Sequence, residues 1–196
     1  MFKIILQTWA GLFYLFNKIF FSRAERSKDE KRERKNRIIS WTVYLIGLPA
    51  WLWLFILKRN WILFGVEFSG APAMALGLYL AIKGIERKPP RWLNIIARLA
   101  IIFGLGFSIY DFGGITTVNQ FLELGVSVGF ILGTYLLARQ RIKGYYWFML
   151  MNACCGTLMF IQSYPVLTIQ QIISLLFVID AWRAKKRKSK LEKEKI

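Results

Sequence analysis

The sequence predicts an all-α fold, a polytopic membrane protein with seven transmembrane helices, and three observations lead to this prediction. Hydrophobic residues make up 56% of the 196 residues, above the roughly 45–50% that is usual for soluble domains. They stand in blocks of about 17–25 residues, the length that a helix needs to cross a bilayer. The basic residues gather in alternate stretches between the blocks, as the positive-inside rule requires of a membrane protein.

Seven apolar blocks fit the length of a membrane span. Several of them begin or end at Trp or Tyr, side chains that favour the membrane interface. The expected helices are roughly Ile4–Phe21, Ile38–Leu57, Trp61–Ile82, Trp92–Tyr110, Phe121–Ala138, Tyr145–Ile161 and Val166–Trp182.

The charge of the connecting stretches gives the expected orientation. The first, third and fifth stretches and the tail contain eight, four, three and eight Lys/Arg, whereas the second, fourth and sixth contain two, none and none. Because Lys and Arg collect in cytoplasmic loops, we expect a bacterial inner-membrane protein with its N-terminus outside and its C-terminus in the cytoplasm. The stretch FFSRAE also allows signal-peptide cleavage after Ala24, but the basic residues that follow argue against it.

The order of the blocks repeats along the chain. The third and seventh blocks begin with carboxylate or carboxamide groups and end in a basic cluster, and the second and sixth open at a tryptophan. An odd helix between two triplets makes the triplets parallel, as in SWEET-type transporters. We therefore expect a single membrane domain, 1–196, in a 3+1+3 arrangement. Its parts are a first repeat at 1–88 with a charged cytoplasmic loop at 22–37, a linker helix at 92–110, a second repeat at 119–182, and a basic cytoplasmic tail at 183–196.

Composition excludes several classes of function. The chain has no histidine, and it contains no phosphate-binding loop or metal-ligand cluster, so we expect neither an enzyme nor a metal or cofactor site. The net charge of +17 would suggest nucleic acid in a soluble protein, but its placement between membrane spans argues against that partner. Cys154 and Cys155 are expected to be packed thiols, because a disulfide between neighbours is strained.

Polar side chains within the apolar blocks are the candidate substrate-binding residues, because such side chains usually face the bundle or a cavity. Asn152 is near the middle of its block, and Glu67 lies toward the outer end of another. The remaining candidates are Gln170, Gln171, Ser174 and Trp147. A structural role is the alternative for each: an interhelical hydrogen bond for the amides, or an interface anchor for the tryptophan.

These residue types favour a small polar solute. Amides suit ribose hydroxyls and carboxamide groups, and aromatic faces suit a flat ring. Because we expect no cluster of Lys or Arg inside the membrane, a phosphate is disfavoured. A neutral or singly cationic nucleoside or sugar fits better.

Gly125, Gly129 and Gly133 stand at four-residue spacing in the fifth block. Small residues at this spacing let helices approach closely. We expect the face to pack inside the bundle, with a subunit interface of a homo-oligomer as the alternative.

The stretches YYWFMLMN and PVLTIQQIISLLFVIDAW resemble the last two spans of the PnuC family of nicotinamide riboside transporters. The resemblance covers mainly Leu122–Lys188, and the first half departs from the family pattern. It implies that Trp147, Asn152 and the Gln170–Gln171 region carry the site. It also implies facilitated uptake of nicotinamide riboside, which phosphorylation then traps in the cytosol.

Two other functions stay open on sequence alone. One is a small-sugar facilitator on the same scaffold. The other is a non-transporting membrane scaffold or interaction protein whose basic loop and tail bind anionic lipid or a partner.

Overall fold

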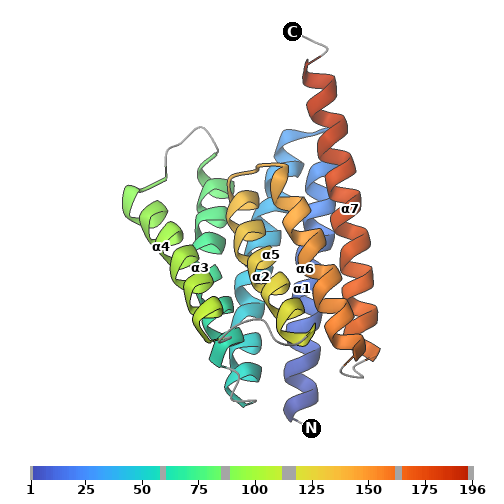
Figure 1. Cartoon of the computed structure of the whole chain (residues 1–196). Coiled ribbons are helices and arrows are strands. Elements are labelled where there is room, and N and C mark those ends of the chain that lie inside the picture. Colours follow the sequence, from blue (N-terminus) through green and yellow to red (C-terminus); the bar gives the residue numbers. More distant parts are fainter. Residues whose placement is uncertain (1, 58–60, 85–88, 112–117, 162–164, 194–196) are drawn as a thin grey trace.

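The structure, a computed structural model, describes residues 2–57, 61–84, 89–111, 118–161 and 165–193. These residues form seven helices and no strand, which confirms the predicted all-α class. In chain order the helices (Figure 1) are α1 (Phe2–Arg26), α2 (Glu30–Leu57), α3 (Trp61–Lys83), α4 (Arg91–Asp111), α5 (Val118–Ala138), α6 (Lys143–Ile161) and α7 (Pro165–Lys193).

The charged stretch at 22–37 is helical rather than a loop, which corrects the sequence prediction. Only three residues between α1 and α2 lie outside a helix. Asp29 caps α2, because its carboxylate accepts hydrogen bonds from the backbone N–H groups of Lys31 and Arg32. Lys, Arg and Glu favour helix in water, so the charged residues extend both helices beyond the apolar blocks. Residues 183–193 of the basic tail are helical for the same reason and belong to α7.

Four helices are long and apolar enough to cross a membrane, judged by the length and composition of the described residues. The four candidate spans are Phe64–Lys83, Val118–Ala138, Lys143–Ile161 and Leu167–Leu191. For α1, α2 and α4 the crossing of a membrane stays a prediction.

Successive helices run in opposite directions, so their connections alternate between the two ends of the bundle (Figure 1). The α1–α2 and α5–α6 connections and the C-terminus lie at one end, and the N-terminus lies at the other. Basic residues gather at the end that holds the C-terminus, because α1 has Arg23 and Arg26 in its last turn and α3 ends at Lys83. We call this end the basic side.

The helix packing has a twofold pattern. If α1, α2 and α3 are exchanged for α5, α6 and α7, each helix contact has a counterpart. The contacts α1–α2, α2–α3 and α1–α7 correspond to α5–α6, α6–α7 and α3–α5. These six helices form a ring. α4 packs against α3 and α5 and lies outside the ring.

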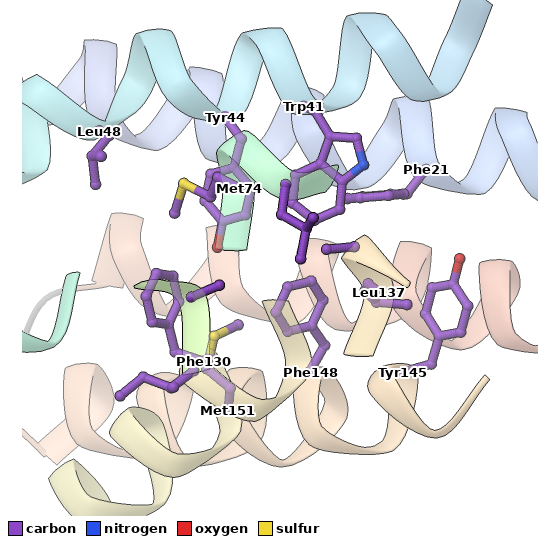
Figure 2. Packing of buried hydrophobic residues seen from close by; sticks show 14 of the residues in the cluster. Phe21, Trp41, Tyr44, Leu48, Met74, Phe130, Leu137, Tyr145, Phe148 and Met151 are labelled. Atoms are coloured by element: carbon purple, nitrogen blue, oxygen red, sulfur yellow. The ribbon is translucent and has the colours of Figure 1, made fainter. Parts of the chain in front are cut away.

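The core between the two groups of three helices is aromatic. Figure 2 shows Trp41 and Tyr44 facing Phe148 and Phe130 across the interface. The rings of Tyr44 and Phe130 meet edge to face with centroids 6.2 Å apart, and Phe21 meets Trp41 in the same way at 5.0 Å. Such pairs contribute about 0.5–1.5 kcal/mol beyond their burial, so in this aromatic layer Tyr44 and Phe130 tie α2 to α5, and Phe21 and Trp41 tie α1 to α2.

The glycines spaced by four residues pack inside the bundle. A Cβ atom on any of Gly125, Gly129 and Gly133 would contact a residue of α6. The glycine face is therefore buried between α5 and α6, as the first of the two alternatives predicted.

Gly129 provides a test of this packing. A Cβ atom there would lie 2.6 Å from the backbone oxygen of Trp147, and backbone atoms cannot relieve the clash unless the helices move. We expect Gly129→Ala to destabilise the protein by about 1–3 kcal/mol, measured as a lower midpoint of thermal unfolding in detergent.

Gly156→Ala is the matched control. Its Cβ atom would lie 3.4 Å from Cβ of Gln171, close to an ordinary contact, and the gain in helix propensity is the same. Equal midpoints for the two variants would contradict the close approach of α5 and α6.

Candidate functional site

A cavity of about 70 Å³ lies inside the ring of six helices, and its lining residues place it in the half of the bundle away from the basic side. Every helix of the ring contributes to its wall, and α4 contributes none of the described lining residues. The wall is formed by Tyr14 of α1, Trp51 of α2, Val66 and Glu67 of α3, Glu123, Val126 and Phe130 of α5, Met151, Cys155, Leu158 and Met159 of α6, and Leu167 and Gln171 of α7.

Polar groups interrupt an otherwise apolar and aromatic wall. Glu67 and Glu123 bring carboxylates from α3 and α5, and Gln171 brings an amide from α7. The hydroxyl of Tyr14 donates a hydrogen bond to the sulfur of Met151 at 3.1 Å, which joins α1 to α6 at the wall. The cavity therefore offers carboxyl groups, other hydrogen-bonding groups and ring faces to a solute.

Asn152 is buried just outside the cavity wall. Its side chain is 1% exposed, and its Nδ2 donates to the backbone oxygen of Phe148 at 2.6 Å. Its Oδ1 has no hydrogen-bond partner among the described residues. Asn152 shares a face of α6 with Cys155 and Met159, which line the cavity, because residues three and seven positions apart lie on one side of a helix. It therefore continues this face of α6 toward the basic side.

Gln171 and Ser174 lie on one face of α7. Gln171 lines the cavity, and the fully buried Ser174 is one turn closer to the basic side. Neither Oε1 of Gln171 nor the hydroxyl oxygen of Ser174 has a hydrogen-bond partner in the described part of the chain. Buried polar atoms without a protein partner are suited to bind a polar solute or water.

Gln170 and Trp147 do not line the cavity in this conformation. Nε2 of Gln170 donates to the backbone oxygen of Gly11 at 3.2 Å, a contact that joins α7 to α1. Trp147 is half-buried on α6. A role of these two residues in binding therefore stays a prediction.

Sequence reasoning did not single out Tyr14, Trp51 or Met151 for the site, although all three line the cavity. Aromatic residues make up 16% of the chain, so composition gives no signal that would distinguish these from the others. Glu123, which was not a candidate from the sequence, also lines the cavity.

Lys18 is the clearest residue that the sequence analysis passed over. Its side chain is 1% exposed, and its Nζ has no hydrogen-bond partner among the described residues. The Nζ atom lies 3.5 Å from the ring centroid of Phe148, 4.4 Å from that of Tyr14 and 5.0 Å from that of Tyr44. The signal was available, because an ionisable residue inside a membrane span is by default a candidate functional residue.

An ionic cluster closes the ring at the basic side. Glu25 of α1 accepts hydrogen bonds from Arg37 of α2 at 2.8 Å and from the hydroxyl of Tyr145 of α6 at 2.7 Å. Lys185 of α7 lies 3.6 Å from Glu25. These contacts tie α1 and α2 to α6 and α7.

Glu33 of α2 extends the ionic cluster, because it pairs with Arg37 and with Lys188 of α7. Burial acts to raise the pKa of Glu33, but the hydrogen bonds from Lys188 and Arg37 outweigh burial and lower the pKa below its ordinary 4.5. A carboxyl group whose pKa is lower in the folded state stabilises the fold above its unfolded pKa. That contribution is lost as the pH falls through the folded pKa.

Cys154 and Cys155 are free thiols, as predicted. Among the residues that the structure describes, no group of three His, Cys, Asp or Glu side chains could hold a metal ion.

The pH dependence of stability tests the ionic cluster. Glu33→Gln should lower the midpoint of thermal unfolding near neutral pH, and the difference from wild type should shrink as the pH falls below about 4.5. Glu30→Gln removes the same charge from an exposed position one turn earlier and should leave the midpoint unchanged. A deficit of Glu33→Gln that stays constant from neutral pH to about 3.5 would show that ion pairing is not its cause.

Comparison with known proteins gives the family of the chain. A family model described as Nicotinamide mononucleotide transporter matches residues 32–187. No curated protein and no solved structure matches the chain. The match includes Glu67, Asn152 and Gln171, whereas Tyr14 and Lys18 precede it.

Proteins of this family are transporters and not enzymes. The chain is thus an integral membrane protein that belongs to the nicotinamide mononucleotide transporter family, the PnuC family that its last two helices resemble.

Proposed function

We propose that the chain carries a nicotinamide ribosyl solute, either the riboside or its 5′-phosphate, across the membrane by facilitated transport. The observation that carries this proposal is the cavity to which all six helices of the ring contribute, in a chain that belongs to this transporter family. Nicotinamide riboside, the solute expected from the sequence, is the first to test.

The moving parts in this proposal are two three-helix repeats, α1–α3 and α5–α7, with α4 as the linker. The twofold pattern of helix contacts supports the 3+1+3 arrangement. Parallel repeats of this kind hold their substrate between the two bundles and give access to each side of the membrane in turn as the bundles rock.

The basic side would face the cytoplasm of a bacterial cell, with the N-terminus outside. The gathering of basic residues at the ends of α1 and α3 and along the last turns of α7 supports this orientation, because Lys and Arg are enriched in cytoplasmic segments. In this orientation the cavity lies in the outer half of the bundle.

The conformation seen here is closed at the basic side. A cavity of about 70 Å³ is well below the roughly 300–1,000 Å³ of small-molecule sites, so a nucleoside requires the two repeats to move apart. Release into the cytoplasm then requires the ionic cluster and the aromatic layer to open.

Recognition follows from the groups on the wall. The Oε1 atom of Gln171, without a protein partner among the described residues, is placed to accept a hydrogen bond from a ribose hydroxyl or a carboxamide N–H. The carboxylates of Glu67 and Glu123 would attract the positively charged pyridinium ring. A pyridinium cation between these two groups would stabilise their ionised form, which a neutral sugar cannot do, so the pair favours a nicotinamide ribosyl solute.

The test is uptake of labelled nicotinamide riboside, and of its 5′-phosphate, by cells that lack their own importer. We expect Gln171→Ala to lower uptake about tenfold, because a lost hydrogen bond to a buried polar group costs about 1–3 kcal/mol. Asn152→Ala should also lower uptake, since its face of α6 continues the wall toward the basic side.

Asn119→Ala is the matched control, because it removes an amide from an exposed position at the start of α5. It should leave uptake at the wild-type level. If a wild-type protein that is well expressed and correctly inserted takes up neither solute, the proposed function is wrong.

A further inference from the structure

Two arginines lie beside one tyrosine where α4 packs against α5. Arg98 of α4 donates a hydrogen bond from Nε to the hydroxyl of Tyr135 of α5 at 3.3 Å. Arg139, directly after α5, places its guanidinium carbon 5.3 Å from the ring centroid of the same tyrosine. Arg139 also donates to the side-chain oxygen of Asn94 of α4. The contact between the two helices therefore holds two guanidinium groups close together.

No carboxylate pairs with these two charges within the described part of the chain. The ion pairs found there join α1, α2 and α7, whereas Arg98 and Arg139 contact a hydroxyl, an aromatic ring and an amide. Nε of Arg139 is buried and has no hydrogen-bond partner among the described residues. Because arginine stays charged in proteins, two such groups held together call for an anion that does not belong to the chain.

The surface around Arg98 is apolar. Arg98 shares one face of α4 with Ile95, Leu99 and Ile102, because residues three, four and seven positions apart lie on one side of a helix. These three side chains are 53%, 58% and 68% exposed. α4 lies outside the ring and packs only against α3 and α5 among the described helices (Figure 1). With α4 as a predicted span, this face meets the acyl chains of the bilayer.

The depth of the two arginines fits a lipid headgroup. Trp92 begins α4 at the basic side and is 63% exposed, as is typical of a tryptophan at the membrane interface. Arg98 follows six residues later, about 9 Å further along the helix, and an arginine side chain is long enough to extend back toward the interface. Arg139 stands at the basic end of α5. In the proposed orientation both arginines reach the headgroups of the cytoplasmic leaflet.

We infer that Arg98 and Arg139 bind the phosphate of an anionic phospholipid from the cytoplasmic leaflet, which joins the linker helix α4 to α5. Its acyl chains lie along Ile95, Leu99 and Ile102. A soluble anion would gain only the charge pairing at this site, whereas a lipid also covers the apolar face. The site is separate from the charged stretch at 22–37 and from the basic tail, where the sequence suggested lipid binding. The inference rests on the fold and not on which solute is transported.

The experiment measures lipid binding to the purified full-length protein, stripped of lipid in detergent, by native mass spectrometry. The measured quantity is the dissociation constant of phosphatidylcholine divided by that of phosphatidylglycerol, which gives the preference for an anionic headgroup. The variants are Arg98→Gln and the double variant Arg98→Gln/Arg139→Gln. The control is Arg32→Gln/Arg187→Gln, which removes two arginines from exposed positions of α2 and α7 at the same basic side.

We expect wild type to prefer phosphatidylglycerol at least tenfold. A basic residue near an anionic lipid contributes about fivefold in affinity, so Arg98→Gln should lower the preference about fivefold and the double variant should abolish it. The control should stay within about twofold of wild type. A defect in packing weakens both lipids alike and leaves the ratio unchanged, so the ratio reports the charge of the headgroup.

Three results would overturn the inference. They are a wild-type protein without a preference, a double variant that keeps the preference, and a control that loses as much of it as the double variant. The last result would show that the basic side attracts anionic lipid as a whole. Loss of uptake in the transport assay has no bearing on this result, because lipid binding is measured without a solute.

Competition separates a lipid from a soluble phosphate. Glycerol 3-phosphate has the phosphate of the headgroup without the acyl chains, and it should leave phosphatidylglycerol bound even in hundredfold excess. Displacement at equal concentration would show that the two arginines form a site for a soluble anion, and the assignment to a lipid would then be wrong.

Discussion

The burial of polar side chains between the helices is the constraint on which the rest of the structure depends. In hydrocarbon an unpaired polar group costs several kcal/mol, so polar side chains have to meet one another, a solute or water inside the bundle. In this chain they meet along the interface of α1–α3 with α5–α7: carboxylates and an amide at the cavity, Lys18 inward of it, and the ionic cluster at the basic side. In the proposed mechanism this same interface opens, so stability and transport act on the same contacts.

The two halves of the interface are held differently. Toward the basic side the interface is closed by the edge-to-face contact of Tyr44 with Phe130 and by ion pairs that join α1 and α2 to α7. In the other half the interface encloses the cavity. There the Tyr14–Met151 and Gln170–Gly11 hydrogen bonds join the two groups of three helices. Breaking a buried ion pair leaves an uncompensated charge, so opening at the basic side needs water or solute to take over these partners.

Much of the fold could be predicted from the sequence, because apolar blocks and alternating loop charge are direct consequences of a membrane environment. The ends of the helices could not be predicted in this way. Lys, Arg and Glu are soluble and also favour helix, so the charged stretch at 22–37 is helical although it lies outside the apolar blocks. Glu67 and Gln171 could be predicted as wall residues because polar groups in apolar blocks turn inward. Which face of each helix points into the bundle could not be predicted, because a block that is apolar on every side has no distinct hydrophobic face. Hence Tyr14 and Trp51 were not identified, and Asn152 was not seen to hydrogen-bond within its own helix.

The central claim is that the solute passes through the interior of the six-helix ring. A nicotinamide riboside derivative with a light-activated cross-linking group, followed by mass spectrometry of the labelled peptides, tests it most directly. The account predicts labels on the wall residues Tyr14, Met151 and Gln171, removed by an excess of unlabelled solute. Labels confined to exposed positions of α4, such as Trp92 and Ile102, would contradict it.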